Sequence, residues 1–178
     1  MDTAREFLTH ELSDMLDAER KILGILEEAQ DDVSNEQLLK AIQNHHKQTQ
    51  GQIERLEQCF QELGEEPQQT ECKGIQGLKQ EKESFMEEDP SEELIEVFTV
   101  GANAKIEHYE IAAYNSMIDL CTQLGMKKAV RLLQQNLREE EQMLKRVEGF
   151  SKKLKVEETG TEEIEEEEAP RSHRRKAA

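Results

Sequence analysis

The chain has 178 residues, of which 35% are charged and 4% are aromatic, and its formal net charge is -17. So acidic a surface repels phosphate groups, which excludes nucleic acid and anionic membrane as main partners. The length suits one domain around one hydrophobic core, and the abundance of Glu, Lys, Gln and Leu predicts an all-α fold.

Two long helices are predicted in the first part of the chain. Apolar residues recur at helical spacing over 4–30 and again over 35–63. Thr3 and Ser34 each begin a capping-box pattern, in which Glu or Gln follows three residues later. The turn between the two ranges is short, so these helices should pack antiparallel as a hairpin.

A long connection follows, and then a second pair of long helices. The stretch GEEPQQTECKG interrupts the apolar pattern, and IQGLKQEKESFMEE after it predicts a short helix over an end or side of the bundle. Asp89 followed by Pro90 is typical of a helix start, so the third long helix is expected from there to Leu124. Gly125 should end it in a left-handed conformation, and the fourth helix is expected over 126–154.

Together these elements predict a bundle of four helices, made of two antiparallel hairpins joined by a crossover that contains the short helix. We expect this domain to cover 1–155. The remaining residues, 156–178, form an acidic run followed by a basic one without apolar periodicity. That composition is typical of a disordered, solubilising tail.

The sequence contains no pattern of a secreted or membrane protein. Its N-terminus, MDTAREFLTHELSD, lacks the apolar core of a signal peptide, and no apolar run approaches the ~18 residues that span a bilayer. We therefore expect a cytoplasmic protein. Three widely spaced cysteines, Cys59, Cys72 and Cys121, favour reduced thiols over a disulfide framework or a thiolate metal site.

Each predicted long helix carries a polar residue within its apolar stripe. In chain order these are Glu19, His45, Glu110 and Glu140. Glu19 and His45 lie equally far from the turn between the first two helices. Glu110 and Glu140 lie equally far from the turn at Gly125, between the last two. Residues equally far from the turn of an antiparallel hairpin lie opposite each other. We therefore expect three carboxylates and an imidazole to meet at one height in the core. Thr49 and Gln52 also interrupt the stripe of the second helix.

Three carboxylates in a dry core need protons or cations, because like charges at contact distance repel by several kcal/mol at an effective dielectric constant of about 20. Carboxylates with imidazole and without thiolate suit iron or manganese, and zinc is chemically possible. Glu107, one helical turn before Glu110, is a candidate for a further ligand or an acceptor for His108. The alternative is structural: a single Glu in an apolar stripe often extends to the surface, and a core His often bonds a neighbour.

Five stretches together resemble the YciE/YciF-like family of ferritin-like bacterial proteins: LDAERKIL, HHKQTQGQIERLEQCF, ECKGIQGL, KIEHYEIAAY and LREEEQ. The resemblance implies a ferritin-like four-helix bundle with a dinuclear metal site, iron or manganese, held by Glu19, His45, Glu107, Glu110 and Glu140. It also implies a homodimer and a role in bacterial stress response.

Two positions depart from the family pattern. Gln48 and Leu144 stand where the family usually has acidic residues, so one metal position has fewer ligands, although Gln48 could assist. One interpretation is a redox-active metal centre that reacts with oxygen or peroxide. The other is a metal-free helical bundle that acts as an interaction or protective factor under stress. Neither interpretation identifies a substrate or a reductant.

Overall fold

The computed structural model describes residues 1–154 of the chain, and these contain five helices and no strand. The helices are α1 (Ala4–Asp32), α2 (Glu36–Leu63), α3 (Lys73–Glu87), α4 (Glu92–Gln123) and α5 (Lys127–Ser151). The predicted all-α fold is confirmed for this part of the chain, in which no helix is both long and apolar enough to be a membrane span. The predicted tail, 156–178, lies outside the described residues.

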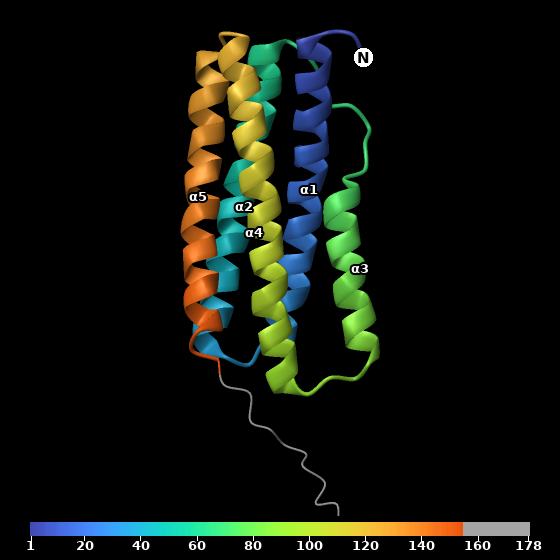
Figure 1. Ribbon diagram of the computed structural model, residues 1–178, viewed down its shortest axis with the longest axis vertical. Coiled ribbons are helices and arrows are strands. Elements are labelled where there is room, and N and C mark those ends of the chain that lie inside the picture. Colours follow the sequence, from blue (N-terminus) through green and yellow to red (C-terminus); the bar gives the residue numbers. More distant parts are fainter. Residues whose placement is uncertain (155–178) are drawn as a thin grey trace, which may run out of the picture.

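The four long helices lie side by side, with α3 on the outside (Figure 1). Helix α1 packs antiparallel to α2 and α4 antiparallel to α5, and the two hairpins meet through α2 with α5 and α1 with α4. The segment 64–91 returns the chain along the bundle before α4 begins, so α2 and α4 run in the same direction.

The N-cap residue of α1 is the one that the local sequence predicts, whereas that of α2 depends on a contact with another helix. Thr3 caps α1 in the predicted capping box, since its side chain accepts a hydrogen bond from the backbone N–H of Glu6. The cap of α2 is Asn35 rather than the predicted Ser34. Glu96 of α4 explains the difference, because it accepts hydrogen bonds from the Ser34 hydroxyl at 3.2 Å and the Asn35 N–H at 2.8 Å.

The predicted start of α4 is displaced, whereas its predicted end is confirmed. Ser91 is the N-cap residue, so Pro90 lies before the helix and not at its first position. Asp89 has a φ of 50°, a left-handed conformation that Asp tolerates better than most residues. Gly125 follows α4 with a φ of 72°, as predicted.

Helix α5 is rotated relative to its predicted stripe. Val130, Leu137 and Leu144 were expected in the core, but each is only half-buried. The buried positions are Ala129, Leu133, Asn136, Glu140, Met143 and Val147. Leu133, Glu140 and Val147 are buried as predicted, whereas Ala129, Asn136 and Met143 each precede a predicted core residue by one position. The buried face is therefore centred about 50° from the predicted stripe, half of the 100° that separates neighbouring residues. Two polar side chains therefore enter the core from α5.

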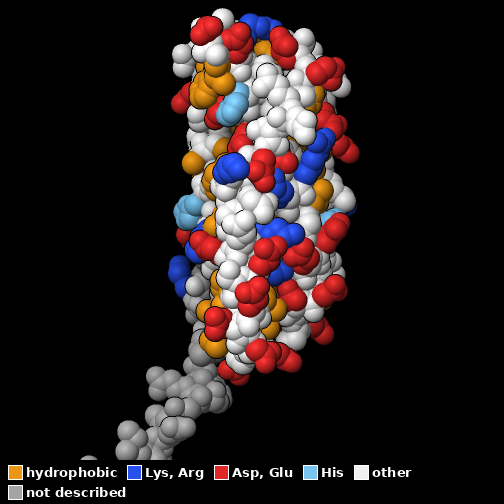
Figure 2. Space-filling view, turned by 90° about the vertical axis from the view of Figure 1, so that its right-hand side faces the viewer, with side chains coloured by type: hydrophobic (Ala, Val, Ile, Leu, Met, Phe, Trp, Pro, Cys, Tyr) orange, Lys and Arg blue, Asp and Glu red, His pale blue; other side chains and the backbone are white. Residues whose placement is uncertain are grey.

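Helix α3 is attached to the outside of the bundle by packing and by ion pairs. Ile75 is fully buried, and the Phe85 ring stacks on Phe98 of α4 with centroids 4.1 Å apart. Lys82 pairs with Asp32 of α1 at 2.9 Å. Acidic side chains are spread over this side of the molecule, with Lys and Arg between them (Figure 2). Packing of apolar side chains and a partly buried ion pair therefore both contribute to this attachment.

The approach of α3 to α4 depends on a glycine. A Cβ atom at Gly74 would lie 2.5 Å from the ring of Tyr109, whereas one at Gly77 would meet nothing within 4 Å. We expect Gly74→Ala to lower the free energy of unfolding by about 1–3 kcal/mol, because the ring must move. Gly77→Ala in the same helix should raise it by up to about 1 kcal/mol. Urea unfolding of both variants measures this, and equal effects would contradict the close approach.

Candidate metal centre

Midway along the bundle, the four long helices bring the predicted site residues together. They are Glu19 from α1, His45 from α2, Glu107 and Glu110 from α4, and Glu140 from α5. Each side chain is at most 2% exposed. The predicted convergence at one height is therefore observed, because positions equally far from each turn do lie opposite each other in these hairpins.

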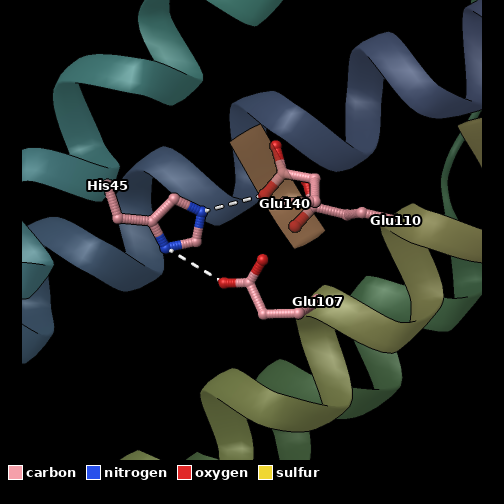
Figure 3. Close-up of side chains that lie close together, drawn as sticks. All are labelled: His45, Glu107, Glu110 and Glu140. Carbon is pink, nitrogen blue, oxygen red and sulfur yellow. Dashed lines mark ion pairs between the residues drawn. The ribbon is translucent and has the colours of Figure 1, made fainter. Parts of the chain in front are cut away.

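Four of these side chains form a compact cluster (Figure 3). His45, Glu107, Glu110 and Glu140 each offer one ligand atom, and these atoms all lie within 4.8 Å of one another. The imidazole lies between two carboxylates: Nδ1 is 3.4 Å from Glu107 Oε1, and Nε2 is 3.6 Å from Glu140 Oε2. Both distances exceed the ~2.7–2.9 Å of a charge-assisted hydrogen bond. The cluster is close enough to share a ligand but is not closed by its own hydrogen bonds.

Buried polar atoms without partners are concentrated at this height. Among the described residues, nine buried side-chain oxygen and nitrogen atoms have no hydrogen-bond partner. They belong to Glu19, His45, Thr49, Gln52, Glu107, Glu110 and Glu140. An unsatisfied buried polar atom costs about 1–3 kcal/mol, so this concentration indicates that a cation or protons belong here.

Burial and mutual repulsion favour protonated carboxyl groups in the metal-free site. Burial raises the pKa of Glu110 well above its ordinary value, and the neighbouring carboxylates of Glu140, Glu19 and Glu107 raise it further. The pKa values of Glu107 and Glu19 are raised in the same way, first by burial and then by the charge of Glu140. A bound divalent cation would remove the cause of both effects and release these protons.

Glu19 lies beside this cluster and is held differently. It accepts a hydrogen bond from the hydroxyl of Tyr114, which in turn accepts one from the Asn136 side chain at 2.9 Å. The sequence prediction missed Tyr114 and placed Ala113 on the core-facing line. The position of Tyr114 one turn after Glu110 was the available signal, since residues four apart share a helix face.

A second set of polar groups adjoins Glu140. Gln52 donates its amide to Glu140 and, at 3.3 Å, to Glu139. Arg55 donates to Glu139 and to Asn136. The cluster is therefore enclosed on one side by hydrogen-bonded polar side chains from α2 and α5.

Gln48 and Leu144 do not take part in the cluster. Gln48 is half-buried and accepts a hydrogen bond from Asn44 at 2.8 Å, so its side-chain oxygen is engaged within α2 in this structure. At 100° per residue, position 48 lies about 60° from His45 around α2, whereas Thr49 lies about 40° away. Thr49 faces the core in its place. His108 is exposed, and Glu107 faces His45 instead.

The donor set fits a divalent metal ion. Imidazole nitrogen and carboxylate oxygen suit iron and manganese and are also compatible with zinc. Metal–nitrogen and metal–oxygen bonds of about 2.0–2.2 Å place ligand atoms on opposite sides of the ion roughly 4.2 Å apart. The observed span of 4.8 Å would need to contract by only a few tenths of an ångström on each side.

The fold and the cluster define a helical-bundle protein with a buried candidate metal site. A family model described as "Domain of unknown function (DUF892)" matches residues 3–160, and the chain belongs to this family. It is 35% identical over 141 residues to Protein YciF of Escherichia coli (strain K12), covering 79% of this chain and 85% of YciF. The YciF-like resemblance is thus confirmed.

Solved structures agree with this assignment. The crystal structure of the E. coli stress protein YciF aligns with a TM-score of 0.81 and 32% identity, covering 85% of this chain and 96% of YciF. YcfI of Rhodopseudomonas palustris aligns with a TM-score of 0.80 and 32% identity, covering 83% of this chain and 94% of YcfI. A Xanthomonas campestris protein with 18% identity and a TM-score of 0.69 shares the fold.

Proposed function

We propose that this protein is a ferritin-like stress protein that binds iron or manganese as a dinuclear carboxylate centre inside its bundle. The observation that carries this proposal is that seven of the nine unpartnered buried side-chain atoms among the described residues belong to the five site residues. Four separate helices supply them, although each buried charge opposes folding when it is left unpaired.

The topology supports the ferritin-like part of the proposal. Two hairpins joined by a long crossover, with ligands projecting inward from all four helices, are the arrangement of dinuclear carboxylate bundles. This chain has a Glu-x-x-Glu pair, Glu107 and Glu110, on α4, and its histidine is on α2. The pattern therefore differs from bundles that have Glu-x-x-His pairs on two helices.

The residues have distinct expected contributions. His45, Glu107, Glu110 and Glu140 would hold the ion, and Glu19 beside them would complete a second position. Bound iron would supply one-electron chemistry toward oxygen or peroxide. A small apolar cavity between α2, α4 and α5, lined in part by Ile42 and Met143, extends to His45.

We also propose that the protein acts in the bacterial cytoplasm, as a homodimer, in the response to stress. The role in stress is supported by the similarity to YciF, which is described as an E. coli stress protein. A metal-free protective or interaction factor is the second candidate. It is favoured by Gln48 and Leu144, which leave the core with fewer ligands than the family pattern has.

Metal content separates the two candidates. Protein purified without chelator should carry iron or manganese, and a variant with both Glu107→Gln and Glu110→Gln should lose most of it, because it lacks two charged ligands. Glu141→Gln is the matched control, since it removes an exposed charge next to Glu140 in the sequence. Elemental analysis per chain measures the three proteins. An equal metal content in wild type and the double variant would contradict binding at this site, and the absence of metal from both would support the metal-free candidate.

A further inference from the structure

Hydrogen bonds divide the carboxylate oxygens of the centre into two sets. Both oxygens of Glu107, both of Glu110, Oε2 of Glu140 and Oε2 of Glu19 have no hydrogen-bond partner among the described residues. Oε1 of Glu19 and Oε1 of Glu140, by contrast, accept hydrogen bonds from Tyr114 and Gln52. Two of the free oxygens adjoin His45, since Glu107 Oε1 and Glu140 Oε2 lie 3.4 Å and 3.6 Å from its ring nitrogens.

The donors of these bonds are themselves held in place. Tyr114 accepts a hydrogen bond from Asn136, whose side-chain oxygen accepts one from Arg55. Arg55 also pairs with Glu139, which accepts from the same Gln52 amide group. We call these five residues, Gln52, Arg55, Tyr114, Asn136 and Glu139, the polar clamp. Because each donor is fixed by another member, neither can turn away without breaking further bonds.

We propose that the polar clamp makes the two metal positions unequal. This inference rests on the proposed function. The first ion binds to His45 and the free oxygens of Glu107, Glu110 and Glu140. A second ion needs Glu19 and Glu140, and on each of these carboxylates Oε1 already accepts a hydrogen bond, from the hydroxyl of Tyr114 or the amide of Gln52. Hydrogen bonds to charged groups are among the stronger ones, so the second ion should bind about tenfold or more weakly.

Anaerobic calorimetric titration of the full-length, metal-free protein with Mn²⁺ tests this inequality. Wild type should show one tight phase and a second phase at least about tenfold weaker. Tyr114→Phe removes one hydroxyl and keeps the ring, so it should strengthen the second phase about tenfold and change the first less than about twofold. Gln52→Met removes the hydrogen bond to Oε1 of Glu140 and should also strengthen the second phase. It gives an independent measurement should the tyrosine variant not fold.

Tyr109→Phe is the matched control. It also removes a hydroxyl from α4, but this hydroxyl contacts Asp14 and Cys72 instead of the centre. It should bind Mn²⁺ as wild type does. Two phases of equal affinity in wild type, or an unchanged second phase in both clamp variants, would overturn this inference and leave the proposed function standing. Absence of any Mn²⁺ binding by wild type would overturn both.

Discussion

Excess manganese or anaerobic ferrous iron should raise the melting temperature of the metal-free protein by about 5–10 °C. A ligand that binds only the folded state adds about 2.7 kcal/mol at a hundredfold excess over its Kd. For a protein of this size, each kcal/mol shifts the melting temperature by about 2–4 °C. Thermal unfolding followed by circular dichroism, with and without metal, measures the shift.

Glu110→Gln should abolish this gain and leave the metal-free protein at least as stable as wild type. The amide keeps the shape of the side chain and removes a carboxyl group whose pKa is raised by burial and by three neighbouring acids. Glu141→Gln, on the exposed face of α5, should retain the full response to metal. An unchanged wild-type melt at millimolar metal would contradict the metal centre. A loss of stability in metal-free Glu110→Gln would indicate a structural partner for this carboxylate.

Metal-free protein should lose stability as the pH rises above the ordinary carboxyl pKa of about 4.3 and through the neutral range. The pKa values of Glu19, Glu107 and Glu110 are raised in the folded state, chiefly by burial. A group of this kind stabilises the fold fully below its unfolded pKa of about 4.3, and this contribution is lost as the pH rises through the folded value. Urea unfolding in the presence of chelator, at steps across this range, measures the decline.

Bound metal should reverse this dependence. Metal binding requires deprotonated ligands, so its affinity increases with pH and offsets the cost of ionising the buried carboxyl groups. The same series with excess Mn²⁺ should therefore show a smaller decline or a rise. The variant with Glu107→Gln and Glu110→Gln should show a shallower decline without metal. Stability of the metal-free wild type that increased with pH over this range would contradict the raised pKa values.

The sequence by itself determined the long helices and the height of the centre. Thr3 with Glu6 and the left-handed Gly125 are local signals, because the atoms that cap a helix end lie within a few residues. Glu19 and His45 are the same number of residues from the turn of their hairpin, and so are Glu110 and Glu140 from theirs. Their common height in the bundle followed from this. Antiparallel helices of equal rise per residue allow no other height.

The tertiary structure alone decided which neighbours meet at that height. The buried face of α5 is centred about 50° from its predicted stripe, which brings Asn136 inward, and Glu96 displaces the predicted cap of α2. The polar clamp depends on such rotations, since Arg55 must reach across to Glu139 and Asn136. Spacing along the chain defines a stripe on each helix, but the rotation of a helix about its own axis is set by packing against all its neighbours at once. Hence the height of the candidate site could be predicted, and the hydrogen bonds that divide it could not.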